Sequence, residues 1–234
     1  MLTDPRHEEF RKAAVDAIPA WYNPWAHLAF PTLFGLSVVA WCIASIHDLK
    51  LWEIALVPAL WVLNNANEWR IHKGLLHKRH RIAPILYERH TPLHHRMYTT
   101  HQMAIRDRRE FRLVLLPSWG IVLLAIGLIV PAALLTAVGL RNIALLYVIV
   151  SLLYTLSYEW LHLSYHLPPE SRVGRMRLVQ ILRRHHALHH DPRLMQRYNF
   201  NVTVPLWDWV RGTIAPQEAL EMVGHPRLRP SEQV

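Results

Sequence analysis

Long apolar stretches without charged side chains constrain the fold of this chain most strongly. Residues 113–140 contain no Asp, Glu, Lys or Arg and are mostly aliphatic. A bilayer core about 30 Å thick is crossed by roughly 20 apolar helical residues, because each residue of an α-helix rises by ~1.5 Å. This stretch therefore predicts a membrane-spanning helix, with residues to spare.

Three further segments have the same character. Residues 17–47 carry no charge, and shorter uncharged runs cover 54–67 and 142–158. For one of the predicted spans, 51–69, a buried helix of a protein core is the alternative interpretation. We expect an all-α integral membrane protein with a bundle of four transmembrane helices, at about 26–47, 51–69, 113–139 and 142–161.

The basic residues indicate an orientation in the membrane. The chain has 26 Lys and Arg against 17 Asp and Glu, and in the four-span arrangement all but Lys50 and Arg141 lie on one side. The positive-inside rule assigns that side to the cytosol. We expect no nucleic-acid partner, because the charges flank apolar spans and no nucleic-acid motif is present. The first 25 residues also lack the short apolar core of a cleavable signal peptide.

Histidines gather in two parts of the sequence. Thirteen of the 17 lie within 72–101 or 162–190, and each window directly follows an even-numbered predicted span. Four spans therefore place both windows on the same, cytosolic side. Ten of these histidines form patterned groups within EWRIHKGLLHK, ERHTPLHHRM, WLHLSYHLP and RRHHALHHDP: His72, His77, His90, His94, His95, His162, His166, His186, His189 and His190.

These spacings favour a metal centre. Helical residues three or four apart share a face, so each group can direct its imidazoles at one point. Because a zinc ion usually takes four ligands, ten imidazoles indicate two metal ions with four or five nitrogens each. Imidazole suits iron, copper, zinc and nickel alike. Chance clustering in a basic interfacial loop is the alternative. His80 and His101 stay ambiguous, and His185 could replace His186.

Three acidic residues lie close in sequence to these histidines. Ligating histidines usually donate their second N–H to a carboxylate or a carbonyl. Glu68 lies four residues before His72, Glu159 lies three before His162, and Asp191 follows the last histidine directly. We expect Glu68, Glu159 and Asp191 to support the ligands, with a direct metal bond open to Glu159. A simple turn is the alternative for Asp191.

The order of the four motifs and their alternation with paired spans resemble the fatty acid hydroxylase/sterol desaturase superfamily. These are integral-membrane enzymes with a histidine-rich dimetal centre. The resemblance covers roughly residues 30–215 and includes the ending NFNVTVPLWDWVRGT. The second motif, His90 with His94 and His95, departs from the pattern, because it reads H-x3-HH where many relatives have H-x2-HH.

The resemblance implies two iron ions (Fe2+/Fe3+), O2 as a co-substrate, an external electron donor, and hydroxylation of the acyl or hydrocarbon chain of a lipid from the bilayer. Desaturation on the same scaffold is the alternative outcome. A membrane zinc hydrolase or a metal transporter is the alternative of a different class. A hydrolase would leave most of the histidines unexplained. A transporter would carry its ligands near the membrane midplane, whereas these motifs follow the ends of spans.

The expected organisation is an N-terminal cytosolic arm (1–25), a fatty acid hydroxylase-like membrane domain (26–215) with a cytosolic helical cap that holds the dimetal site, and a C-terminal tail (216–234). Neither arm nor tail is long enough for a cytochrome b5 domain. We therefore expect a separate electron-transfer protein, either a ferredoxin or a cytochrome b5 with its reductase. The compact chain favours a bacterial inner membrane over the endoplasmic reticulum. It does not specify an oligomeric state.

Overall fold

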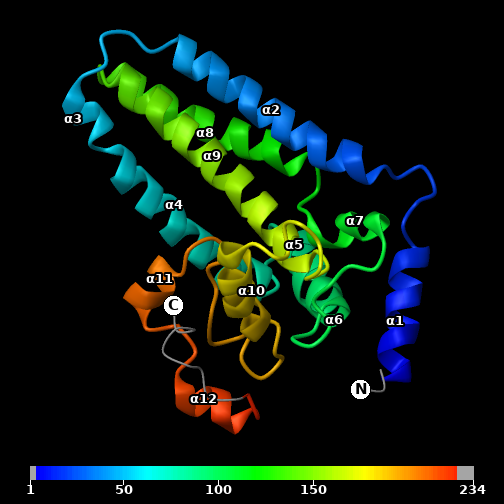
Figure 1. Cartoon of the computed structure of the whole chain (residues 1–234). Coiled ribbons are helices and arrows are strands. Elements are labelled where there is room, and N and C mark those ends of the chain that lie inside the picture. Colours follow the sequence, from blue (N-terminus) through cyan, green and yellow to red (C-terminus); the bar gives the residue numbers. More distant parts are fainter. Residues whose placement is uncertain (1–3, 226–234) are drawn as a thin grey trace. The chain divides into compact units, whose positions relative to one another are not determined.

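A computed structural model describes residues 4–225 of the chain, and the ordered elements in that range are helices, without a named strand (Figure 1). Residues 1–3 of the expected arm and 226–234 of the expected tail lie outside this range. The helices are α1 (Pro5–Asp16), α2 (Pro24–Ala44), α3 (Leu51–Ile54), α4 (Val57–Ile71), η1 (His72–Leu76), α5 (Pro84–Arg89), η2 (His90–His94), α6 (His95–Met97), η3 (Arg108–Glu110), α7 (Phe111–Val114), α8 (Gly120–Ala137), α9 (Arg141–His166), α10 (Arg177–His189), α11 (Leu206–Arg211) and α12 (Gln217–Met222).

The chain divides into two compact units. The apolar unit comprises residues 23–64 and 115–160, and the histidine unit comprises residues 4–22, 65–114 and 161–225. Helices α4 and α9 begin in the apolar unit and end in the histidine unit. The chain thus passes between the units within continuous helices as well as through loops.

In the apolar unit, the helices α2, α8 and α9 run alongside one another (Figure 1). They pack around a core of buried apolar side chains. Many other apolar side chains of α8 point outward, and Leu123, Val130 and Leu134 are 56%, 65% and 65% exposed. Outward apolar surface is what a helix in contact with lipid chains requires. The buried core residues are Val39, Cys42, Ile121, Leu128, Ile149, Leu152 and Leu156.

One close helix contact in this unit depends on a glycine. A Cβ atom added to Gly35 of α2 would lie 3.1 Å from a methyl carbon of Leu156 in α9. Small residues let membrane helices approach closely, and van der Waals packing then holds them together because lipid supplies no hydrophobic driving force. Gly35 therefore fixes how closely α2 and α9 pack.

Within residues 4–225, three helices are long and apolar enough to cross a membrane, namely α2, α8 and α9. The predicted span at 51–69 is not one continuous helix, so a bundle of four transmembrane helices is not confirmed. The segment is interrupted between α3 and α4. Pro58 has no N–H to donate to the Ile54 carbonyl, as an unbroken helix would require. The amide of Leu56 instead closes a tighter turn onto the Glu53 carbonyl at 3.2 Å.

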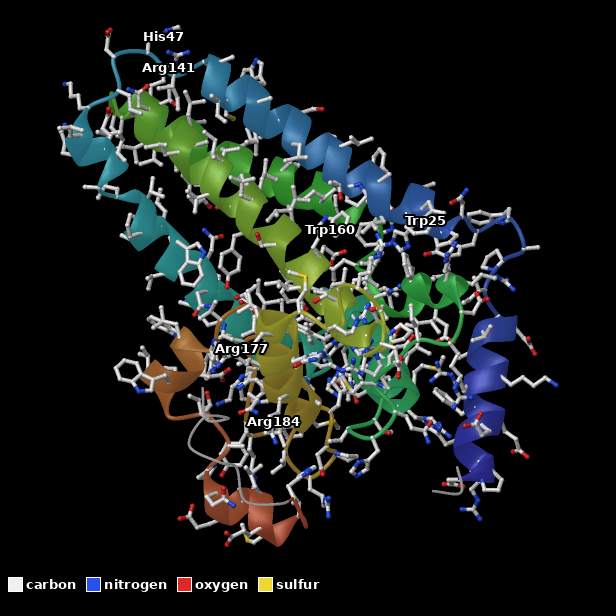
Figure 2. All side chains as sticks on the ribbon, in the orientation of Figure 1. Trp25, His47, Arg141, Trp160, Arg177 and Arg184 are labelled. Carbon is white, nitrogen blue, oxygen red and sulfur yellow. The ribbon has the colours of Figure 1, made fainter. Side chains whose placement is uncertain are left out.

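One end of the apolar unit carries a histidine and an arginine, and tryptophans lie toward the other end. Figure 2 shows His47 and Arg141 at one end of the helices, with Trp25 and Trp160 toward the other. The Trp160 indole N–H donates to the Thr32 hydroxyl at 3.2 Å, which links α9 to α2 near that end. Tryptophan favours the membrane–water interface, where its ring is apolar and its N–H finds polar partners. The distribution is typical of helices that reach from one interface to the other.

The histidine unit closes with a buried irregular stretch, residues 198–203, which we call the closing segment. Glu68 of α4 accepts hydrogen bonds from the backbone N–H groups of Val202 and Thr203. Asp208 of α11 accepts from backbone N–H groups just upstream. Buried backbone donors need such partners, because burial without a hydrogen bond costs about 1–3 kcal/mol each. Two carboxylates thus accept backbone hydrogen bonds that carbonyls of a sheet or a helix would otherwise accept.

Candidate metal centre

The ten patterned histidines come together in the histidine unit and divide into two groups of five. In each group, one ligand nitrogen per residue lies within 4.8 Å of every other. Metal–nitrogen bonds of ~2.0–2.1 Å would place opposite ligands roughly 4.2 Å apart, so each group has the size of a coordination sphere. The first histidine group is His72, His77, His90, His95 and His189, and the second histidine group is His94, His162, His166, His186 and His190.

Two π-helical turns build most of the first histidine group. His72 begins the turn η1 and His77 directly follows it, whereas His90 begins η2 and His95 follows that turn. The His95 amide donates to the His90 carbonyl, the i to i+5 bond of a π-helix. Five residues rotate an α-helix by about 500°, which would leave such pairs roughly 140° apart. The π-turns bring residues i and i+5 onto one side, and such turns are frequent at functional sites.

Ordinary α-helical pairs build the second histidine group. His162 and His166 lie one turn apart at the end of α9. His186 and His190 lie one turn apart at the end of α10, where the His190 amide donates to the His186 carbonyl at 3.2 Å. Residues four apart share a helix face. His94 completes the group from η2.

Two His–His dipeptides, 94–95 and 189–190, are divided between the two groups. His95 and His189 belong to the first histidine group, while their chain neighbours His94 and His190 belong to the second. The rings of His95 and His190 stack with centroids 4.2 Å apart, where the groups adjoin. The two groups are therefore neighbouring halves of one centre.

Backbone carbonyls fix the tautomers of several ligands. In the first histidine group, Nδ1 of His72 meets the Phe200 carbonyl and Nδ1 of His189 meets the Tyr198 carbonyl at 2.9 Å. A carbonyl oxygen only accepts, so the proton must be on Nδ1. The Nε2 atoms of these rings therefore carry free lone pairs.

Carbonyls have the same role in the second histidine group. The residues that accept from His94, His166 and His190 are Leu113, Met103 and Tyr98, at 2.9, 2.7 and 2.5 Å. The buried Nε2 of His166 has no hydrogen-bond partner among the described residues. A buried nitrogen with an unshared lone pair is costly unless a proton donor or a cation faces it.

One nitrogen pair shows why a cation fits. His77 Nε2 lies 2.8 Å from His189 Nε2. The His77 Nδ1 atom lies 3.3 Å from the Thr91 hydroxyl oxygen, whose own proton goes to the Leu76 carbonyl. When His77 donates its Nδ1 proton to that hydroxyl, both facing Nε2 atoms are lone-pair acceptors, which cannot hydrogen-bond to each other. A metal ion accepts such lone pairs, and neutral imidazole is the form that binds it.

Burial keeps the imidazoles neutral. Loss of hydration, together with the proximity of His189 and His94, lowers the pKa of His77 to about 2. Burial likewise lowers the pKa values of His94 and His189 to about 4, although the carbonyl contacts partly oppose the shift. At neutral pH these rings do not need to lose a proton before they bind a metal ion.

The three predicted carboxylates have different partners. Glu68 binds the closing segment, and its hydrogen bond from the Thr203 hydroxyl is 2.6 Å long. Glu159 accepts from the Leu116 amide at 3.2 Å. Asp191 pairs with Arg193 at 2.7 Å, as the turn interpretation expects. The supporting acceptors described above are backbone carbonyls, and a supporting role for Glu68 and Glu159 stays a prediction.

The ambiguous histidines separate clearly. His186 lies in the second histidine group, whereas His185 lies outside both and contacts Asp208, with Nε2 3.2 Å from a carboxylate oxygen. His80 and His101 are exposed. His90, the residue that departs from the usual motif, lies in the first histidine group.

Sequence reasoning missed the carbonyl acceptors of the closing segment and of residues 98–113. A carbonyl exists at every residue, so no residue type marks the ones that face a ligand. The sequence contains a partial indication of this hydrogen-bond network. Asn199, Asn201 and Asp208 are polar residues in the mostly apolar segment 199–213, and such residues indicate buried hydrogen bonds.

In the described part of the chain, three helices apolar enough to span a membrane and ten buried imidazoles in two adjoining groups define a membrane protein with an all-histidine site able to hold metal. The family model described as "Fatty acid hydroxylase" matches residues 57–213, a range that includes both histidine groups. The chain belongs to this fatty acid hydroxylase family, which indicates an oxidoreductase. No curated protein and no solved structure matches the chain.

Proposed function

We propose that this protein is a di-iron membrane oxygenase that hydroxylates the acyl or hydrocarbon chain of a lipid, using O2 and electrons from a separate donor protein. Family membership supports the reaction class. The facing lone pairs of His77 and His189, 2.8 Å apart, carry the metal part of the proposal. Desaturation of the same substrate class is the second candidate, since both outcomes begin with attack on a C–H bond.

In this proposal, the residues of the chain would bind the ions, orient the ligand rings and exclude water. Bound iron would supply the redox chemistry for attack on an unactivated C–H bond, which side chains alone cannot perform. Each histidine group would hold one ion, with ring orientations set by the carbonyls of the closing segment and of residues 98–113. All ten imidazoles are buried, so bulk water is kept from the centre.

We further propose that the α3–α4 segment crosses the membrane as an interrupted helix. Residues 4–22 and 65–114 belong to the same compact unit, so the chain that leaves through α2 must return before residue 65. The 21 residues from Leu51 to Ile71 would rise about 31 Å as a helix, enough for one crossing. The histidine unit would then face the cytosol, as the distribution of basic residues favours.

Metal stoichiometry tests the proposed centre. We expect about two iron ions per chain in detergent-purified protein expressed with iron, measured by mass spectrometry. His77→Ala in the first histidine group and His162→Ala in the second should each retain about one ion, and the double variant none. His101→Ala, an exposed histidine, is the control. One tightly bound zinc ion, unchanged in all variants, would favour a zinc hydrolase instead.

Product analysis separates the two oxygenase outcomes. Cells expressing the protein would be grown under 18O2 and their lipids compared with those of cells expressing the double variant. A hydroxylated lipid containing 18O supports the proposal. An additional double bond without 18O would support desaturation. No lipid difference between the two strains, in the presence of a reducing partner, would contradict both.

A further inference from the structure

We propose that Asp208, paired with His185, is a positioning residue for the first histidine group and has no comparable effect on the second. The inference rests on the proposed metal centre and concerns two residues that bind no metal in it. Both side chains are buried, with Asp208 fully inaccessible to solvent. They stand behind the ligands and act through the closing segment and α10.

Asp208 uses both carboxylate oxygens. Oδ1 accepts from the Phe200 amide at 3.0 Å and from the Thr213 hydroxyl at 2.7 Å. Oδ2 accepts from the Asn201 amide at 2.7 Å and from His185 Nε2 at 3.2 Å. Four donors converge on one buried carboxylate, so its position and that of the closing segment determine each other.

The closing segment transmits this position to two metal ligands. The carbonyl of Phe200 accepts from His72 Nδ1, and the carbonyl of Tyr198 accepts from His189 Nδ1. The amide of Phe200 thus donates to Asp208, while the carbonyl of the same residue accepts from the ligand His72. Moving that peptide plane would rotate the His72 ring and withdraw its Nε2 from the site.

His185 connects the same carboxylate to α10, which supplies His189. Its side chain donates to Asp208, and its backbone carbonyl accepts from the Asn199 side-chain amide at 3.0 Å. Four residues before His189, one bond therefore fixes α10 to Asp208 and the other fixes it directly to the closing segment. This arrangement explains why the histidine-rich stretch contains a fourth histidine that lies in neither group.

The second histidine group takes His186 and His190 from α10, but the carbonyls that orient its rings lie outside the closing segment. The carbonyls that orient His94, His166 and His190 belong to residues 98–113, which contribute no hydrogen bond to Asp208 among those described. A change at Asp208 should therefore weaken one metal site and spare the other. A residue required only for folding would affect both.

The test is a competitive metal titration of the purified full chain with Co2+ against a chromophoric chelator. In the wild type we expect two bound ions. Asp208→Asn replaces one acceptor oxygen by an NH2 group that faces donors, and we expect one affinity to fall by about tenfold, in the range found for residues that support metal ligands. Asp191→Asn, the same change in another buried aspartate next to a ligand, is the matched control.

Combined variants show which site is affected. Asp208→Asn with His162→Ala should bind its one ion more weakly than His162→Ala alone, whereas Asp208→Asn with His77→Ala should bind its one ion as tightly as His77→Ala alone. His185→Asn removes a single hydrogen bond and should weaken the same site to a smaller degree, so the inference can still be tested if Asp208→Asn does not fold.

Equal loss at both sites in His185→Asn and Asp208→Asn, or unchanged affinities in both, would overturn the inference while leaving the proposed centre intact. A wild-type chain that binds fewer than two ions would overturn the proposed centre itself, and this inference with it.

Discussion

At the scale of single residues, one buried ion pair allows the cost of its loss to be estimated. Arg11 and Glu110 form an ion pair with a separation of 2.5 Å and side-chain exposures of 4% and 2%. Glu110 also accepts from the Tyr98 hydroxyl at 3.1 Å. Tyr98 in turn offers its carbonyl to His190, so this pair stands directly behind the second histidine group.

We expect Glu110→Ala to lower the free energy of unfolding by about 3–5 kcal/mol, because it leaves the Arg11 guanidinium buried without its partner. Glu88→Ala is the matched control, since Glu88 pairs with Arg79 at the surface and should cost less than about 1 kcal/mol. The measurement is denaturant unfolding in detergent, followed by tryptophan fluorescence. Similar losses in the two variants would contradict the buried-pair interpretation.

The lowered histidine pKa values predict how acid affects the metal-free protein. His94 and His189 have pKa values of about 4 in the folded chain against an ordinary 6.5, so the unfolded chain binds more protons between these values. Stability must then fall as the pH decreases from about 6.5 toward 4. We expect the unfolding temperature of chelator-treated protein to drop across this range.

A variant tests the assignment. His94→Gln with His189→Gln removes two of these buried imidazoles, so the unfolding temperature of the metal-free variant should depend less steeply on pH. An equally steep dependence would assign the acid sensitivity to other groups.

At the scale of elements, the structure differs from the sequence prediction where a helix departs from regular α geometry. The spacing H-x4-H does not place two residues on one face of an α-helix, and no residue type in HKGLL marks a π-turn. The helices α2, α8 and α9 were predictable because length and apolar composition alone define a span. The break before α4 had a local signal in Pro58, which the apolar composition of the segment obscured.

The close packing of α2 on α9 gives a prediction at this scale. Gly35→Leu should weaken the apolar unit by about 1–3 kcal/mol, because its side chain would overlap Leu156 in α9. Gly127→Leu in α8 is the control, since a Cβ there meets no atom within 4 Å. The unfolding temperature in detergent is the readout. A loss in the control as large as in Gly35→Leu would refute the packing argument.

At the scale of the whole molecule, four separate stretches of sequence meet at the centre. All ten histidines of the two groups were identified from their spacing, because their residue type is rare and their chemistry is specific. Their division into groups was not predictable, since it depends on how distant helices meet. The metal-binding role of the ten residues remains a prediction.

Metal removal should destabilise the whole histidine unit, because an ion that binds only the folded chain adds stability that grows with the ratio of its concentration to Kd. At a hundredfold excess over Kd the contribution is about 2.7 kcal/mol per ion. We expect a strong chelator to lower the unfolding temperature of the wild type. The His77→Ala/His162→Ala variant should show no such decrease, and an equal decrease there would indicate a chelator effect unrelated to the centre.

Membrane topology can be tested with single cysteines, because Cys42 is the only natural one. In a Cys42→Ser background, His47→Cys and Arg81→Cys should react with an impermeant maleimide from opposite sides of the membrane if α3 and α4 cross it. Both positions are exposed. Arg141→Cys, at the same end of the apolar unit as His47, should match the His47 label. Labelling of His47→Cys and Arg81→Cys from the same side would refute the crossing.

The divided His–His dipeptides affect the order in which the centre fills. When one ion immobilises His95 and His189, the adjacent His94 and His190 lose most of their conformational freedom as well, because a single peptide bond joins each pair. The second ion then meets ligands whose ordering entropy has already been lost. The second ion should therefore bind more readily than the first.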